Sequence, residues 1–134
     1  AKSMYGKSYE NLGKVIDFQV PIKDVHGDKA GKIDLIAFSE SDSALYLLEF
    51  KKPDSKETLL RCILEAYTYY KQVSLAKLLS DFELPAHSNI IPAVLIYKQS
   101  FATMSLESPF LQQLRNAFGI SIFLINETGV IEKA

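Results

Sequence analysis

Hydrophobic and polar residues alternate along the chain in a way that predicts several β-strands. In the first of these segments apolar side chains occupy every second position, which is the period of a strand with one buried face. Two further segments flank a polar turn at 39–43, so they are expected to form an antiparallel hairpin. The last two are almost continuously apolar, as in strands covered on both faces. The predicted strands are 15–22, 32–38, 44–52, 90–98 and 120–126.

Helical periodicity fills the remaining segments. Apolar residues recur every three or four positions from Lys56 to about Ser80, which predicts a long helix. A shorter helix is expected over 108–118, closed by a glycine, and another over 3–12. The order of short helix, three strands, long helix, strand, helix and strand predicts one α/β domain over 1–134. Its sheet would be mixed, with helices on both faces.

The predicted hairpin ends in charged residues that share a face with apolar ones. Because side chains alternate along a strand, Glu49 and Lys51 point to the same side as Leu47. A turn centred at residues 41 and 42 places Asp34 directly opposite Glu49 on the neighbouring strand. Two opposed carboxylates at the rim of an apolar face repel each other, so this arrangement costs stability unless something compensates it.

A divalent cation is one such compensation. Mg²⁺, or Mn²⁺ in its place, is held by one or two carboxylates together with water and phosphate oxygens, and Asp34 and Glu49 supply the carboxylates. Lys51 would orient a metal-bound water or neutralise charge developing on a phosphate. The residues therefore predict a site for phosphodiester hydrolysis. A solvated strand end is the alternative, because a Glu-x-Lys spacing occurs by chance in most proteins.

The two strands of the hairpin also resemble a known family. "GKIDLIAF" and "LYLLEFKK" are similar to the core motif of the PD-(D/E)XK nuclease superfamily, and the predicted element order resembles its restriction endonuclease-like αβββαβ core. The resemblance implies that Asp34 and Glu49 bind the metal ion, that Lys51 is the catalytic lysine, and that the substrate is DNA. Ile33 stands where the motif name has proline.

The same resemblance points to residues outside the hairpin. Many members carry a glutamate on the first helix, which would make Glu10 a third metal ligand, although a solvated helix residue explains it equally well. Some branches place Gln-x-x-x-Tyr on the long helix, and here Glu65 and Tyr69 have that spacing, with glutamate in place of glutamine. Lys52 and Lys56 would contact nucleic-acid phosphates.

Composition adds limits on partners and compartment. The formal net charge is −1, which gives no general attraction to nucleic acid or to an anionic membrane. No apolar run reaches the roughly 18 residues of a membrane span. Cys62 is the only cysteine and is expected to pack inside a helix, so a soluble, cytoplasmic protein is predicted. His26 and His87 lie in separate predicted loops without a partner at zinc-ligand spacing.

Three functions remain open from the sequence. The expected one is a metal-dependent nuclease, acting as a homodimer or within a larger multidomain assembly, with RNA not excluded as substrate. The second is a catalytically silent nuclease-fold module that binds nucleic acid or protein within a DNA-processing or defence assembly, which the near-neutral charge fits slightly better. The third is a structural domain in which Asp34 and Lys51 form an ion pair.

Overall fold

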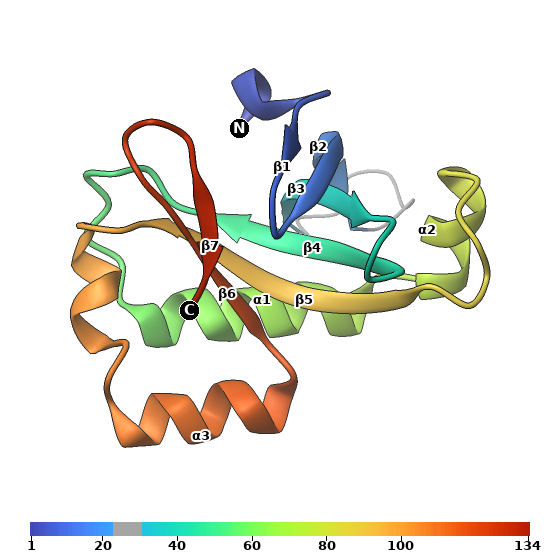
Figure 1. Ribbon diagram of the computed structural model, residues 1–134. Helices are drawn as coiled ribbons and strands as arrows, with labels where there is room; N and C mark the ends of the chain where they lie inside the picture. Colours follow the sequence, from blue (N-terminus) through green and yellow to red (C-terminus); the bar gives the residue numbers. More distant parts are fainter. Residues whose placement is uncertain (23–30) are drawn as a thin grey trace.

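A mixed sheet of seven strands, arranged in the order of the sequence, organises the molecule (Figure 1). The computed structural model describes residues 1–22 and 31–134. The strands are β1 (Ser8–Tyr9), β2 (Gly13–Pro21), β3 (Lys32–Ser39), β4 (Ala44–Phe50), β5 (Asn89–Tyr97), β6 (Ser121–Ile125) and β7 (Ile131–Lys133). The helices are α1 (Leu59–Gln72), α2 (Leu75–Asp81) and α3 (Pro109–Phe118), with short 3₁₀ turns η1 (Lys2–Met4) and η2 (Phe101–Ser105).

The pairing of neighbouring strands changes from antiparallel to parallel inside the sheet and back to antiparallel at its far edge. β1 to β4 are antiparallel neighbours, β4, β5 and β6 run parallel, and β7 is antiparallel to β6. Parallel neighbours need crossover connections, which α1 with α2 and then α3 supply. The predicted α/β class with a mixed sheet is therefore confirmed. None of the helices described is long and apolar enough to cross a membrane.

Local capping chemistry sets the helix boundaries. Thr58 precedes α1 and its hydroxyl accepts a hydrogen bond from the Arg61 N–H at 3.1 Å. Val73 is extended, and the Ser74 hydroxyl then caps α2, so the single helix expected from Lys56 to Ser80 is in fact two helices. The helical spacing of apolar residues continues through this point, but an extended residue followed by a capping serine ends one helix and begins the next.

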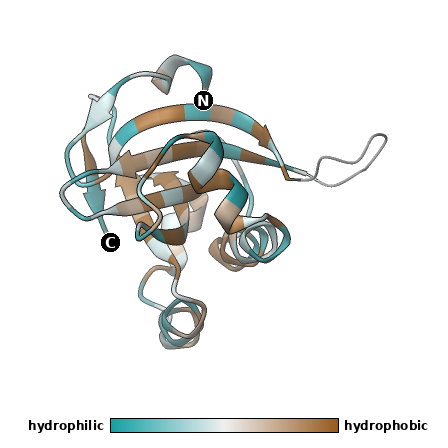
Figure 2. Cartoon of the chain, turned by 90° about the vertical axis from the view of Figure 1, so that its right-hand side faces the viewer, coloured by the Kyte–Doolittle hydropathy of each residue, from teal (hydrophilic) through white to brown (hydrophobic). Residues whose placement is uncertain are grey.

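All three helices lie on one face of the sheet, where two groups of apolar residues are buried. α1 and α3 cover Val94, Ile96 and Ile122, while Leu78 of α2 packs with Leu45 and Leu47. Figure 2 shows how strongly the hydrophobic residues concentrate on the strands. The prediction of helices on both faces is wrong for the residues described.

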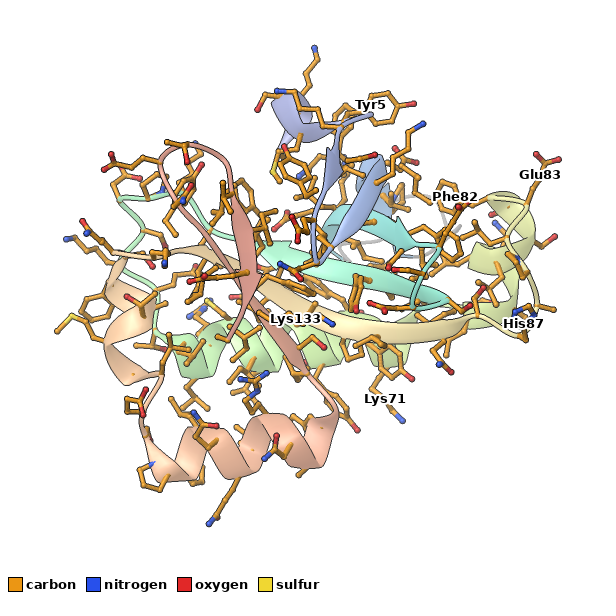
Figure 3. The ribbon with its side chains drawn as sticks, viewed as in Figure 1. Tyr5, Lys71, Phe82, Glu83, His87 and Lys133 are labelled. Atoms are coloured by element: carbon orange, nitrogen blue, oxygen red, sulfur yellow. The ribbon has the colours of Figure 1, made fainter. Side chains whose placement is uncertain are left out.

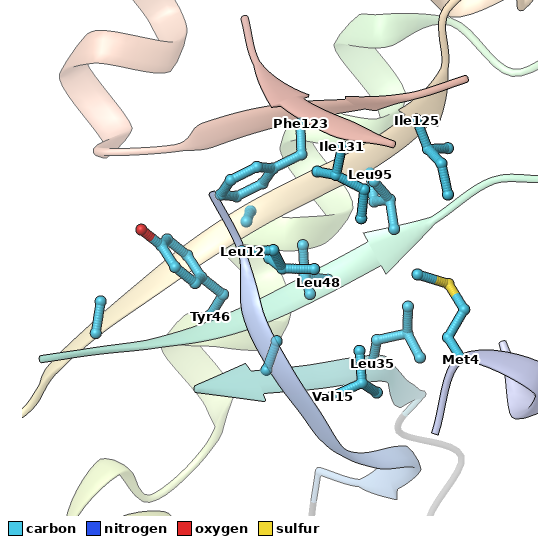
Figure 4. Close-up of a cluster of buried hydrophobic side chains, with 13 residues drawn as sticks. Met4, Leu12, Val15, Leu35, Tyr46, Leu48, Leu95, Phe123, Ile125 and Ile131 are labelled. Atoms are coloured by element: carbon cyan, nitrogen blue, oxygen red, sulfur yellow. The ribbon is translucent and has the colours of Figure 1, made fainter. Parts of the chain in front are cut away.

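The N-terminal segment and β7 cover the opposite face instead (Figure 4). Leu12 and Met4 pack there against the central strands, together with Ile131. The short helix expected over 3–12 is not formed. Positive φ angles at Gly6 and Asn11 turn this segment into η1 and a β-turn, because the left-handed conformation is incompatible with a continuing α-helix.

Candidate active site

The β3–β4 hairpin has the register that the sequence predicts. Its partners run from Leu35 opposite Leu48 to Ser39 opposite Ala44. Asp34, the next residue outward, accepts a hydrogen bond from the Phe50 N–H through Oδ2 at 2.9 Å. Its side chain is thereby held at the end of β4, beside Glu49.

Glu49 is a buried carboxyl group, with 4% of its surface exposed. Its strand partner on β5 is Val94, in the apolar layer beneath α1. Burial, a hydrogen bond with Glu65 and the charge of Asp34 together raise the pKa of Glu49 to about 8, although the contact with Lys51 opposes the shift. At neutral pH Glu49 therefore carries a proton in the folded protein.

Lys51 lies among three carboxyl groups. Its Nζ is 2.7 Å from Oε2 of Glu49, 2.5 Å from Oε2 of Glu57 and 3.5 Å from Oε2 of Glu65. Burial alone would lower the pKa of Lys51, but its hydrogen bonds to Glu49 and Glu57, and the charges of Glu49 and Glu65, raise it above its usual range. Lys51 is therefore an ammonium ion at any pH at which the protein would work.

The first two turns of α1 complete this charged cluster. Glu65 accepts a hydrogen bond from Nε of Arg61 at 3.1 Å, and Arg61 itself is 70% exposed at its side chain. Burial favours the protonated form of Glu65, but its hydrogen bond with Glu49, together with Lys51 and Arg61, lowers its pKa below the usual range. The pKa of Glu49 is thus raised and that of Glu65 lowered by their mutual contact, so Glu49 binds a proton more readily than Glu65 does.

Tyr69 lies one turn beyond Glu65 on the same side of α1. A Cβ atom placed on Gly31 would lie 2.6 Å from its hydroxyl oxygen, so the ring reaches the start of β3. Burial raises the pKa of Tyr69, and the charges of Glu49, Glu65 and Asp34 add to the effect. Both residues of the predicted Glu-x-x-x-Tyr pair therefore adjoin the hairpin carboxylates.

Two residues of this site were not expected from the sequence. Glu57 belongs to the loop before α1, and no periodicity relates such a residue to a strand. Gln19 of β2 donates a hydrogen bond from Nε2 to Oδ1 of Asp34 at 3.3 Å, and its backbone is left-handed, with φ at 51°. A register shift between Val15 and Asp17 brings Gln19 opposite Asp34, and alternation alone does not reveal such a shift.

Other predicted residues lie outside this cluster. Glu10 is exposed in the turn between β1 and β2, at the end of β3 opposite to Asp34, because β2 pairs Lys14 with Phe38 and Val20 with Ile33. The structure therefore does not bring Glu10 to the other carboxylates. Lys52 and Lys56 are exposed in the loop between β4 and α1.

The histidines and the cysteine take no part in the site. His87 is exposed in the loop between α2 and β5 (Figure 3), and His26 lies outside the described residues. Cys62 is buried on α1, as expected of a packing residue, and burial raises the pKa of its thiol to about 12. Such a thiol is a poor nucleophile at neutral pH.

The donor set suits a hard cation that keeps water or phosphate ligands. Across residues 1–22 and 31–134, no three His, Cys, Asp or Glu side chains are grouped so as to hold a metal ion. Asp34 and Glu49 are two carboxylates on adjacent strands, which is the number that Mg²⁺ commonly takes from a protein. The hydrogen bonds from Phe50 and Gln19 orient Asp34, as supporting donors do for metal-binding carboxylates.

Comparisons with known proteins provide no relative. No family model matches the chain, and no match was found among curated proteins or among solved structures. The function therefore has to be argued from the residues and their geometry.

Proposed function

We propose that the protein is a metal-dependent nuclease of the PD-(D/E)XK type that hydrolyses phosphodiester bonds, with DNA as its substrate. The observation that carries this proposal is that Asp34, Glu49 and Lys51 lie together at the edge of the sheet where β3 begins and β4 ends. A buried carboxyl group held next to a second carboxylate costs stability, and such a cost is typical of functional sites.

The arrangement of the elements supports the same assignment. The antiparallel strands β2, β3 and β4, the crossover through α1, and the parallel strand β5 correspond to the βββαβ part of the restriction endonuclease-like core. The initial helix of that core has no counterpart among the residues described. This departure leaves the face opposite α1 to the N-terminal segment and β7.

Each residue of the cluster has a role in such hydrolysis. A divalent ion held by Asp34 and Glu49 would supply Lewis-acid activation of water and phosphate. Lys51 donates hydrogen bonds and positive charge, which stabilise the extra negative charge of the reacting phosphate. Glu65, ionised and in contact with Glu49, provides a path by which the proton that Glu49 must lose to act as a ligand can reach the solvent.

The decisive experiment combines metal binding with cleavage. Mg²⁺ and Mn²⁺ are titrated by calorimetry into the wild type, Asp34→Asn and the control Asp42→Asn, and plasmid DNA, single-stranded DNA and RNA are assayed on the same samples. Asp42 is exposed in the turn at the other end of the hairpin. We expect binding and cleavage in the wild type and the control, and neither in Asp34→Asn. Absence of metal binding in the wild type, with DNA present, would contradict the proposal.

A catalytically silent module within a DNA-processing or defence assembly is the second candidate. It is favoured by the contacts of Lys51, whose ammonium already lies within hydrogen-bond distance of Glu49 and Glu57. This module would bind metal or partner without cleaving. The structural domain with an ion pair between Asp34 and Lys51 is not supported. Lys51 contacts Glu49 and Glu57, and among the described residues no ion pair joins Lys51 to Asp34.

Location and assembly form part of the same proposal. We infer a cytoplasmic enzyme. We also infer that it acts as a homodimer or inside a larger multidomain assembly, and a homodimer would supply the two sites that cutting both strands of a duplex requires. Lys52 and Lys56, exposed beside the cluster, would contact phosphates of the bound strand.

A further inference from the structure

A pocket of about 550 Å³ lies beyond the carboxyl ends of β5 and β6, next to the loop that follows β4. This volume is within the range of roughly 300–1,000 Å³ that is usual for ligand sites. Ligands of open α/β sheets commonly bind outside the carboxyl ends of the parallel strands. Its lining includes Pro53, two residues after Lys51 in the chain, and residues of the β6–β7 turn.

The apolar part of the pocket is built from Pro53, Tyr97 and Ile125. Tyr97 is half-buried, and its ring packs against the ring of Phe50 with centroids 6.1 Å apart. The position of this aromatic ring is therefore set by the strand that carries Glu49. A fixed aromatic surface beside a proline is suited to a flat, apolar ring of a ligand.

The polar part is the β6–β7 turn, in which hydrogen bonds to Asn126 hold the backbone. Oδ1 of Asn126 accepts hydrogen bonds from the N–H of Thr128 at 3.0 Å, the hydroxyl of Thr128 at 2.8 Å and the N–H of Val130 at 2.9 Å. The amide of Asn126 can thus offer a ligand only its N–H donors, whereas the carboxylate of Glu127 offers acceptors. Gln99 lines the pocket as well and offers both.

This pocket lies close to the proposed site of hydrolysis. The Lys51 N–H donates to the carbonyl of Leu95 at 3.2 Å, so the chain leaves β4 alongside β5. Pro53 follows two residues later, and two residues span about 7 Å at most. Phe50 and Tyr97 pack on the face of the sheet opposite to that of Val94, the strand partner of Glu49, so a strand bound at Lys51 would reach the pocket by passing around the end of β4 at exposed Lys52.

We propose that the pocket binds an unpaired nucleobase of the strand that is cut. A base has two flat faces and an edge of donors and acceptors, and the pocket offers Tyr97 to a face and Gln99 and Glu127 to an edge. A base inside a duplex has its faces stacked and its edge paired, so it does not enter. The substrate is therefore a single strand, or a duplex with a frayed or extruded nucleotide; this assignment deepens the proposed nuclease function and rests on it.

Binding of the base is tested without metal and without cleavage. Amide signals of the ¹⁵N-labelled protein are followed by NMR as deoxyadenosine or deoxycytidine monophosphate is added, with deoxyribose 5-phosphate as the probe that lacks a base. We expect shifts at Gln99 and Thr128 with the nucleotides and none with the sugar phosphate. Equal shifts with both probes, or none at these positions, would overturn the pocket assignment.

Variants then locate the contact. Tyr97→Leu is expected to weaken nucleotide binding roughly tenfold or more, since base stacking on an aromatic side chain contributes strongly. The control is Tyr5→Leu, because Tyr5 is 56% exposed in another part of the molecule. Loss of the Phe50 contact in Tyr97→Leu can disturb folding, so exposed Glu127→Ala serves as the second variant. Unchanged affinity in Glu127→Ala and in folded Tyr97→Leu would overturn the assignment.

Failure of the pocket and failure of the nuclease are separable. The KM for single-stranded DNA is compared with that for the same strand with one abasic nucleotide beside the cleaved bond. A KM that rises about tenfold, with kcat nearly unchanged, supports the pocket. Cleavage with equal KM values overturns the pocket alone. If NMR shows that nucleotides bind but DNA is not cleaved in the presence of Mg²⁺ or Mn²⁺, the nuclease proposal is overturned and the pocket is identified as a nucleotide site.

Discussion

The ammonium of Lys51 lies 2.5 Å from a carboxylate oxygen of Glu57, which comes from the loop before α1 and not from the hairpin. The lysine that would act on a phosphate is therefore already bound by an anion. Glu57 occupies one of the positions from which a phosphate oxygen would approach Lys51. Under the proposed nuclease function, a substrate would have to displace this carboxylate before Lys51 could stabilise the reacting phosphate.

We expect the substitution Glu57→Gln to accelerate cleavage. It removes the competing charge while retaining the shape of the side chain, and Glu57 is 37% exposed, so its ion pair resembles surface pairs of about 0.2–1 kcal/mol. The corresponding increase in kcat/KM is about 1.4- to fivefold. Initial rates are measured on single-stranded DNA with Mg²⁺. Glu107→Gln, at the same position relative to α3, is the control, and a rate below that of the wild type would contradict the displacement model.

The stability of the protein should fall as pH rises through the neutral range. Burial raises the pKa of Glu49 to about 8 from its ordinary 4.5, so the folded state keeps a proton that the unfolded state loses. The stabilisation is complete below pH 4.5 and disappears as pH rises to about 8. The slope is at most about 1.4 kcal/mol per pH unit. Urea unfolding at pH 5.5, 7 and 8.5 measures it.

The matched variant for this pH dependence is Glu49→Gln. Glutamine keeps a hydrogen-bond donor for Glu65 and cannot titrate, so its unfolding free energy should vary much less between pH 5.5 and 8.5. We expect it to equal that of the wild type near the low end of this range and to exceed it at pH 8.5. Parallel pH profiles for the two proteins would show that Glu49 is ionised in the folded state.

Metal binding at neutral pH should release a proton. A ligating carboxylate must be ionised, and Glu49 is protonated before the ion arrives, so about one proton should leave for each Mg²⁺ bound near pH 7. Calorimetric titrations in buffers with different enthalpies of ionisation give this number directly. Identical binding enthalpies in the two buffers would place the metal elsewhere, and Glu49→Gln should bind no metal.

The sequence was sufficient to predict the hairpin and its register. A turn centred at residues 41 and 42 fixes the alignment of the two strands, and the observed pairing of Leu35 with Leu48 confirms it. The proximity of Asp34 to Glu49 follows from that pairing. Glu65 and Tyr69 were assigned to the site by the family resemblance alone.

Other parts depended on details that periodicity does not contain. The contact between Gln19 and Asp34 needs a bulge near Ile16, and the position of Glu10 depends on positive φ angles at Gly6 and Asn11. The split of the long helix reflects a cap at Ser74 that competes with a continuing apolar period. Which elements cover the second face is a property of the whole sheet, so local patterns cannot predict it.

Gly13 offers a test of how closely β2 approaches β3. Its φ is 99°, and a Cβ atom there would lie 2.2 Å from the carbonyl oxygen of Phe38, a backbone atom that cannot move aside. We expect Gly13→Ala to lower the unfolding free energy by about 3 kcal/mol or more, from strain and overlap together. Gly129→Ala is the control, since φ there is 86° but nothing lies within 4 Å, so strain alone should cost about 1 kcal/mol. Urea unfolding at pH 7 compares the two, and equal losses would mean that β2 does not approach β3 as closely as described.

Because β2 carries Gln19 to Asp34, a loosened β2 should also weaken Mg²⁺ binding in Gly13→Ala and leave it unchanged in Gly129→Ala.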